Sequence, residues 1–258
     1  MAHRKMYAIA ATPIAVLVLA ALTSANAHPS PAPFRSTVIA STVRSPSPTV
    51  SPFTTPAVTP RPSTALTKTI YLTFDDGPNP IWTAEILSIL ESHGVHASFF
   101  VIGEEAKAWP YLVRREALDG NMVGDHSWSH PNLTRLSPSA VSAELARDKN
   151  LITELTGKTP SLWRPPYGAF NLPVFDIGSA LAMRMELWGA STGDWQLPGT
   201  SVIVSRVMSA LRNGLVVLLH DGGGYTRTET VAAVAILIPK LEAAGYRVAA
   251  LPMQGVHW

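Results

Sequence analysis

From Lys68 onward, short β-rich runs alternate with amphipathic helical runs, and this alternation narrows the accessible folds more than any other feature. Helical spacing of apolar residues predicts helices at 82–93, 111–118, 138–155, 201–211 and 228–244. Strands are expected at 69–74, 97–102, 121–125, 162–164, 184–189, 214–219 and 246–251. Gly94 is placed to end the first helix, and Ser137 to cap the third. Such a pattern predicts a mostly parallel sheet covered by helices, either closed into a barrel or left open.

The N-terminal segment, 1–27, has the pattern of an export signal. A short basic start at 3–5 precedes an uncharged apolar run at 6–22, and Ala25-Asn26-Ala27 supplies the small side chains of a cleavage site. We expect cleavage after Ala27. The alternative is a retained membrane anchor. The apolar run is at the lower limit for spanning a bilayer, Pro13 interrupts it, and no basic cluster follows it.

The next segment, 28–67, has a different composition. Pro, Ser and Thr together make up more than half of it, and it contains neither Asp nor Glu. A stretch of this kind cannot bury enough apolar surface to offset its ordering entropy, so we expect a disordered, extended linker. It serves either as a stalk or as a neutral spacer. The rest of the chain, 68–258, is expected to form one α/β domain.

Charge and cysteine content exclude several classes of protein. The chain has a net charge of +2, but segment 1–67 contributes only basic side chains, namely Arg4, Lys5, Arg35, Arg44 and Arg61. With these five removed, segment 68–258 carries 15 Lys and Arg against all 18 Asp and Glu, a net charge of −3, which argues against a nucleic-acid partner. The absence of cysteine excludes disulfide scaffolds, zinc ribbons and thiol nucleophiles.

In parallel α/β folds, chemistry collects at the carboxyl ends of the strands. Asp75-Asp76-Gly77-Pro78 directly follows the first predicted strand. Asp-Gly-Pro suits a turn, but a turn needs only one Asp, and two adjacent carboxylates repel each other unless a cation compensates them.

Two histidines follow the third predicted strand. His126 and His130 are four positions apart, so one side of a helical turn can bring both to a single metal ion. This spacing is a weak signal alone. With a free carboxylate it becomes a two-histidine, one-carboxylate site that suits zinc, cobalt or a similar divalent ion. Trp128, between the histidines, is expected to shape a substrate groove.

Two further groups occupy strand ends. Arg164-Pro165-Pro166-Tyr167-Gly168 is either a plain loop or a rigid turn that presents a backbone N–H to an oxyanion. Gly193-Asp194-Trp195 and Leu218-Leu219-His220 end two later strands. A histidine with an aspartate available to orient it is an acid–base arrangement.

Taken in order, these motifs resemble those of the polysaccharide deacetylases, carbohydrate esterase family 4. The resemblance covers the segment 69–251 and rests on Thr73-Phe74-Asp75-Asp76-Gly77-Pro78, His126-Ser127-Trp128-Ser129-His130, Arg164-Pro165-Pro166-Tyr167, Asp194-Trp195 and Leu218-Leu219-His220. It implies an α/β fold of a particular kind, a distorted (β/α) barrel with fewer than eight full strands.

The resemblance also implies a role for each motif residue. Asp76, His126 and His130 are expected to bind the metal, most often Zn²⁺, with Co²⁺ or a similar ion as the alternative. Asp75 is expected to be the general base and His220 the general acid. Arg164 would hold Asp75, and Asp194 would hold His220. The backbone N–H of Tyr167 would stabilise the oxyanion, while Trp195 and Leu218 would form walls of the acetyl pocket.

The sequence therefore predicts a secreted, metal-dependent hydrolase that removes N-acetyl groups from a β-linked amino-sugar polymer such as peptidoglycan or a chitin-like glycan. An O-acetyl xylan esterase is the alternative within the same family, and a non-catalytic wall-binding module is the alternative outside it. We expect a monomer, extracellular or associated with the cell wall, without stable membrane association once the signal is removed.

Overall fold

The computed structural model describes residues 68–224 and 226–253 of the 258-residue chain. The predicted signal, its cleavage site at Ala27 and the predicted linker at 28–67 lie outside these ranges. Within them, every helix is too short or too polar to cross a bilayer.

A parallel sheet forms the centre of the domain. Its strands are β1 (Lys68–Asp75), β2 (Ser98–Val101), β3 (Met122–Asp125), β4 (Leu162–Trp163), β5 (Arg184–Met185), β6 (Ala190–Ser191), β7 (Leu215–His220) and β8 (Tyr246–Val248). The order is β5-β4-β3-β2-β1-β7-β6, and β8 pairs with the start of β1. The outermost strands β5 and β6 do not pair in the described ranges, so the sheet is a curled half-barrel. The predicted distorted barrel is confirmed in this form.

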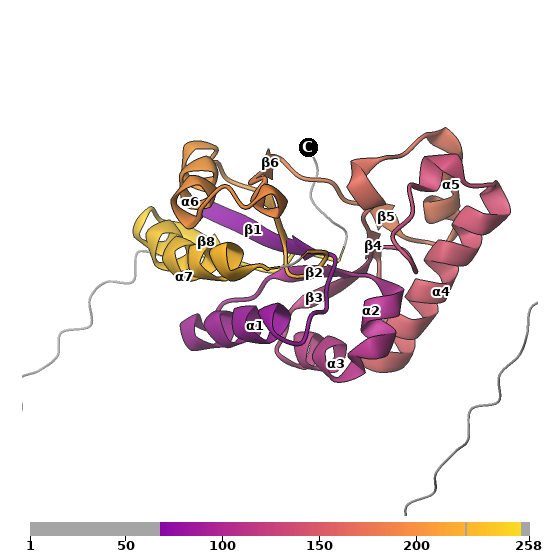
Figure 1. Ribbon diagram of the computed structural model, residues 1–258, viewed down its shortest axis with the longest axis horizontal. Coiled ribbons are helices and arrows are strands. Elements are labelled where there is room, and N and C mark those ends of the chain that lie inside the picture. The colour runs from indigo at the N-terminus through magenta and orange to yellow at the C-terminus, as the bar shows by residue number, and fades with distance from the viewer. Residues whose placement is uncertain (1–67, 225, 254–258) are drawn as a thin grey trace, which may run out of the picture. The chain divides into compact units, whose positions relative to one another are not determined.

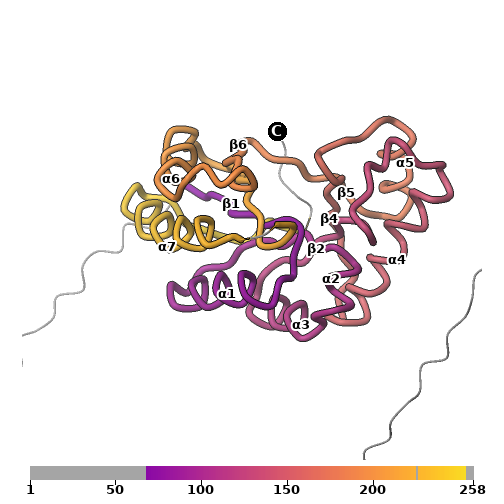
Figure 2. Tube along the Cα trace, in the orientation of Figure 1, coloured from indigo at the N-terminus to yellow at the C-terminus, as the bar shows by residue number. Residues whose placement is uncertain are grey.

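Helices cover the outside of the sheet. They are α1 (Trp82–His93), α2 (Gly103–Ala108), α3 (Pro110–Leu118), α4 (Pro138–Thr156), α5 (Leu172–Ala180), α6 (Thr200–Ser209) and α7 (Thr228–Ala243). Figure 1 shows them in an arc around the strands, from α6 through α7, α1 and α3 to α4 and α5, and Figure 2 traces the same path. Short 3₁₀ turns lie at η1 (Leu133–Arg135), η2 (Pro166–Gly168) and η3 (Asp194–Gln196).

Alternation along β1 separates the helix-covered core from the inner face of the sheet. Ile70, Leu72 and Phe74 are fully buried in the main core, where they pack with side chains of α1, α6 and α7. Thr73 and Asp75 point to the other face because successive strand residues alternate. The last polar residue of β1 therefore lies inside the curl, at the carboxyl end of the sheet.

A second core supports the segment that follows β3. Leu133, Leu145 and Trp163 belong to this cluster, which joins η1, α4 and β4. The two predicted caps are confirmed. The Ser137 hydroxyl accepts a hydrogen bond from the N–H of Ala140 (3.3 Å) at the start of α4. Gly94 ends α1 in a left-handed conformation, at φ 62°.

Candidate active site

Strand register brings the predicted motifs to one edge of the sheet. Asp75, the last residue of β1, pairs with His220, the last residue of β7. Asp125 ends β3 and is followed directly by His126. Motifs that lie far apart in the sequence therefore meet, because parallel strands end at a common edge.

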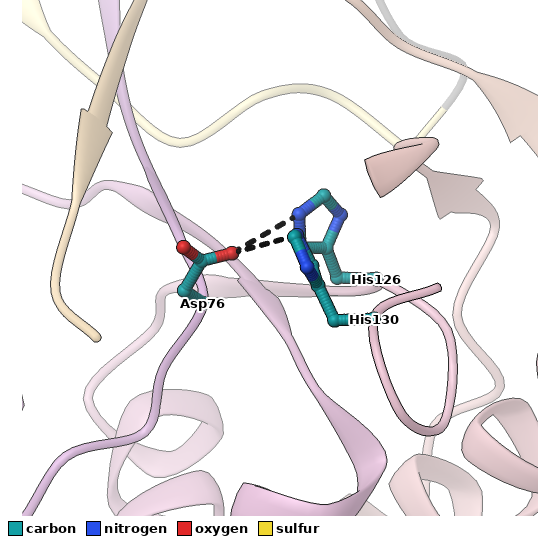
Figure 3. A group of neighbouring side chains, drawn as sticks. All are labelled: Asp76, His126 and His130. Atoms are coloured by element: carbon teal, nitrogen blue, oxygen red, sulfur yellow. Dashed lines mark ion pairs between the residues drawn. The ribbon is translucent and has the colours of Figure 1, made fainter. Parts of the chain in front are cut away.

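Asp76, His126 and His130 converge on one point. The Oδ1 atom of Asp76 lies 3.1 Å from Nε2 of His130 and 3.4 Å from Nε2 of His126. Figure 3 shows both imidazoles turned toward this carboxylate, with His126 and His130 on one loop and Asp76 on another segment. Oδ1 is buried, and no residue in the described ranges forms a well-aligned hydrogen bond with it.

The tautomer of His126 is set by a backbone carbonyl. Its Nδ1 donates to the carbonyl oxygen of Arg164 (2.7 Å), which leaves the Nε2 lone pair directed toward Asp76. The three ligand atoms lie within 4.8 Å of one another. Two imidazole nitrogens and one carboxylate oxygen match the donor set of a divalent ion such as Zn²⁺, so these residues fit the predicted metal.

The charges around the cluster of Asp76, His126 and His130 favour a positive charge at its centre. Burial would raise the pKa of Asp76, but the facing imidazoles of His126 and His130, with the charges of His126 and His220, hold it well below its usual range. Burial would also lower the pKa of His126, yet the charges of Asp75 and Asp76 outweigh burial and raise it. A bound divalent cation would supply the positive charge that the carboxylates favour, and the imidazoles would not need to be protonated.

The backbone is strained at the residues that form this cluster. Four residues here have a positive φ, which residues other than glycine seldom adopt: Asp76 (φ 72°), Ser127 (φ 69°), His130 (φ 57°) and Tyr167 (φ 61°). Such strain of about 1–3 kcal/mol per residue is found mainly where function requires it. Here it occurs at two of the three clustered residues, Asp76 and His130, and at Ser127 and Tyr167 beside them.

Asp75 is held by a buried arginine. Nη1 of Arg164 donates to Oδ1 of Asp75 (2.7 Å) and to the hydroxyl of Thr73 (2.8 Å). Its Nε and Nη2 donate to the carbonyl oxygens of Glu186 and Leu187, each at 3.0 Å. With Oδ1 fixed, Oδ2 lies 3.7 Å from Nε2 of His126, beside the cluster of Asp76 and the two histidines. This arrangement suits a general base.

His220 is oriented by Asp194. Oδ1 of Asp194 accepts from Nδ1 of His220 (2.8 Å), and Oδ2 accepts from the N–H of His220 (2.8 Å) and the hydroxyl of Thr230 (2.9 Å). Burial would lower the pKa of His220, but the hydrogen bond and charge of Asp194, with the charges of Asp75 and Asp76, raise it. The imidazolium form, which can donate a proton from Nε2, is thereby favoured.

Tyr167 borders the metal cluster on a second side. Its ring meets that of His130 edge-on at 4.6 Å between centroids. In the described parts of the chain no acceptor receives its backbone N–H, although the next two N–H groups bond to Pro165 and Pro166. That N–H is therefore free to bond an oxyanion.

These groups surround a cavity of about 500 Å³. It is lined by Asp75, Asp76, Ile102, His126, His130, Tyr167, Gly168, Trp188, Trp195, Leu218, His220, Gly223 and Arg227. Eight of the predicted site residues are in this lining. The other two, Arg164 and Asp194, lie behind it and hold Asp75 and His220.

Several lining residues were not predicted from the sequence. Gly223 passes against the carboxylate of Asp76, and any side chain there would collide with it. The run of three glycines after Asp221 is a signal that could have revealed this close approach. Arg227 carries no comparable signal. The expectation for Trp128 was wrong, because Trp128 is buried under the guanidinium of Arg147 (3.5 Å) and does not line the cavity.

Two further buried carboxylates hold the histidine loop. Oδ2 of Asp148, on α4, accepts from the N–H of His126 (3.1 Å), and Oδ1 of Asp125 accepts from the N–H of Ser127 (2.8 Å). Burial raises the pKa of Asp125 to about 7 and raises that of Asp148 as well. The backbone at His126 and Ser127 is therefore tied to α4 and to the end of β3.

Comparisons with known proteins agree with this geometry. The family model for polysaccharide deacetylase matches residues 63–185. A chitooligosaccharide deacetylase of Bradyrhizobium sp. (strain ANU 289) is 36% identical over 197 residues, which cover 72% of this chain and 90% of that protein. The peptidoglycan-N-acetylmuramic acid deacetylase PdaC of Bacillus subtilis (strain 168) is 41% identical over 180 residues, 70% of this chain but only 37% of PdaC.

A solved structure shows the same fold. The family 4 carbohydrate esterase from Streptomyces lividans, in complex with acetate, superposes with a TM-score of 0.68 at 32% identity and covers 74% of this chain and 97% of its own. Likeness in sequence, fold and motif order leads to one conclusion: the chain belongs to the polysaccharide deacetylase family, carbohydrate esterase family 4.

Proposed function

We propose that this deacetylase is a metal-dependent N-deacetylase of glycans that contain N-acetylglucosamine. The observation that carries the proposal is the presence of a held base, Asp75, and a held acid, His220, in the cavity that contains the cluster of Asp76, His126 and His130. The substrates named for the relatives, chitooligosaccharide and peptidoglycan, support this substrate class.

Asp76, His126 and His130 would hold the ion, and Zn²⁺ suits their donor atoms best. When bound, such an ion lowers the pKa of water and polarises a carbonyl group. The protein's own residues supply the remaining requirements: a proton acceptor, a proton donor and an oxyanion donor.

The reaction is the hydrolysis of an acetamide. Oδ2 of Asp75 takes a proton from the attacking water, whose oxygen forms a bond to the carbonyl carbon. The N–H of Tyr167 donates to the oxygen that becomes negative. The C–N bond then breaks as Nε2 of His220 gives its proton to the amine, leaving acetate and a free amino sugar. The acid is necessary because an amine is a poor leaving group.

Two variants separate the base from the metal ligands. Asp75→Asn should lower acetate release by about 10²–10⁴-fold, because it removes the general base. Elemental analysis should still find about one equivalent of metal, since Asp75 is not a ligand. His130→Ala should lose metal and activity together, while His93→Ala, on the exposed end of α1, should retain both. Metal loss in Asp75→Asn would refute the assignment of roles.

Product analysis distinguishes the alternatives. Mass spectrometry should show acetate release from chitooligosaccharides, and a chelator should stop it. Preferential release from acetylxylan would instead identify an O-acetyl esterase. Glycan binding without acetate release, and without an effect of chelator, would identify a non-catalytic wall-binding module.

We also propose that the protein is exported and acts outside the cell as a monomer. The basic start, apolar run and small residues at the predicted cleavage site support export. N-terminal sequencing of the protein from culture medium should begin at His28. A protein that retains Met1 and sediments with membranes would contradict cleavage and favour an anchor.

A further inference from the structure

A second cavity adjoins the catalytic cavity and shares a wall with it. It has a volume of about 510 Å³ and is lined by Pro131, Asn132, Arg135, Leu136 and Tyr167. Tyr167 lines both cavities and is 68% exposed. A polymer with an acetamido group in the catalytic cavity can therefore cross the Tyr167 ring and place a neighbouring sugar in the second cavity.

The second cavity is tied to the metal cluster through the backbone. Pro131 directly follows the ligand His130, and the buried side chain of Leu133 anchors η1 in the second core. The Asn132 carboxamide oxygen accepts from the N–H (3.1 Å) and the hydroxyl (2.7 Å) of Thr134, which leaves its NH₂ group as a donor. The position of η1, and of Arg135 at its end, is thus set relative to the reacting centre.

The positive charge of Arg135 in this cavity has no carboxylate partner among the described residues. Arg135 is exposed, forms no ion pair within the described ranges, and no carboxylate lines the cavity. Glu144, which like Asp148 reaches the histidine loop from α4, is bonded to the N–H (2.8 Å) and hydroxyl (3.0 Å) of Ser129. The guanidinium of Arg135 is therefore available to bind an anion of a ligand.

The walls around that charge suit a sugar ring. Pro131, Leu136 and the ring of Tyr167 present apolar surface, against which the apolar face of a pyranose can pack. A guanidinium binds a carboxylate more strongly than it binds a hydroxyl, because both partners are charged and the geometry is bidentate. A neutral chitin-like chain would fill the apolar walls but leave Arg135 without an anion.

We propose that the second cavity is a subsite for an acidic sugar, in which Arg135 binds a carboxylate carried by the residue next to the one that is deacetylated. The inference rests on the proposed function and narrows its substrate to an acidic N-acetylated glycan, as in peptidoglycan. The carboxylate belongs either to a lactyl ether on the sugar or to a peptide attached to it.

The test compares three soluble glycans of equal length: a chitotetraose, a tetrasaccharide of alternating N-acetylglucosamine and N-acetylmuramic acid, and the same tetrasaccharide with its stem peptides. The metal-loaded enzyme is assayed for acetate release. Arg135→Glu should raise KM for an acidic glycan about tenfold and leave kcat/KM for chitotetraose within about twofold. Arg114→Glu, the same charge change on the exposed face of α3, is the matched control and should change neither.

The two acidic glycans identify the source of the carboxylate. Sensitivity to Arg135→Glu with the peptide-free tetrasaccharide assigns the lactyl group, and sensitivity only with the peptide-bearing one assigns the peptide. An equal loss on all three glycans, or no loss on either acidic glycan, would overturn the subsite.

Measurements of glycan affinity test the subsite without any need for turnover. Calorimetry on Asp75→Asn should show tighter binding of an acidic glycan than of chitotetraose, and adding Arg135→Glu should remove the difference. Equal affinities in Asp75→Asn would overturn the subsite. Failure of the wild-type enzyme to release acetate from any glycan would overturn the proposed function instead, with the calorimetric result still deciding the subsite.

Discussion

At the scale of single residues, two adjacent aspartates acquire different tasks from their partners. Asp75 is bonded to the fully buried guanidinium of Arg164, while Asp76 faces the Nε2 atoms of His126 and His130. The positive φ of Asp76 turns its carboxylate away from the direction that Asp75 takes. The carboxylate of Asp75, the proposed base, is thereby left beside the cluster, and that of Asp76, a proposed ligand, faces both imidazoles.

His220, the proposed acid, depends on its hydrogen-bond partner Asp194. Asp194→Asn should lower the pKa of His220, because the hydrogen-bonded charge of Asp194 helps to raise it against burial. Since the protonated form is the acid, the alkaline limb of the kcat/KM profile should move to lower pH, and activity should fall about 10²-fold. Asp176→Asn, an exposed change on α5, is the control. An unmoved alkaline limb would contradict the role of Asp194.

At the scale of elements, the strong periodic signals predicted most of the sheet and five of the helices. The sequence did not predict α2, α5 or β6. The elements α2 and β6 are too short to show a period, and Pro173 and Gly178 weaken the helical signal of α5. The first two N–H groups of α2 nevertheless bond to the carbonyls of Ser127 (3.0 Å) and Trp128 (2.9 Å). A short helix that packing stabilises thus holds the histidine loop.

The helix α5 is also held by close packing, against the indole of Trp163. Gly178 faces the indole of Trp163, and an added Cβ would lie 2.5 Å from Nε1. Gly178→Ala should therefore lower the free energy of unfolding by about 1–3 kcal/mol, despite the better helix propensity of alanine. Chemical denaturation measures the change, with the exposed neighbour Ser179→Ala as the control. A more stable Gly178→Ala protein would show that this contact is not tight.

At the scale of the whole molecule, the interior carries an unusual number of carboxyl groups. Glu116, Asp125, Asp148 and Asp221 are almost completely buried, and burial raises the pKa of each. Asp76 and Asp194 have lowered pKa values, so their contribution to stability is lost as pH falls, whereas that of the four buried groups is lost as pH rises. The stability of the fold is thus linked to pH by groups that border the catalytic cavity as well as by distant ones.

Asp221 provides a test of this linkage. Burial raises its pKa to about 7 in the folded chain, above the ordinary value of 3.8, so the folded protein holds a proton that the unfolded chain loses first. The free energy of unfolding should fall by up to about 1.4 kcal/mol per pH unit as pH rises between these values. Asp221→Asn should lack this component, and its carboxamide oxygen can still accept from the hydroxyl of Thr83. Parallel pH profiles of unfolding would contradict the shift.

The sequence by itself determined the fold class and the motif residues, because strand and helix periods are local and the motifs follow strand ends. It also predicted the ten site residues that the structure brings together. Only the tertiary structure decided which atoms meet: that Trp128 is buried, that Gly223 and Arg227 line the cavity, and that Arg135 stands unpaired in a second cavity beside Tyr167, within the part of the chain that the structure describes. The physical reason is that burial and charge pairing depend on residues distant in the chain, which no local period records.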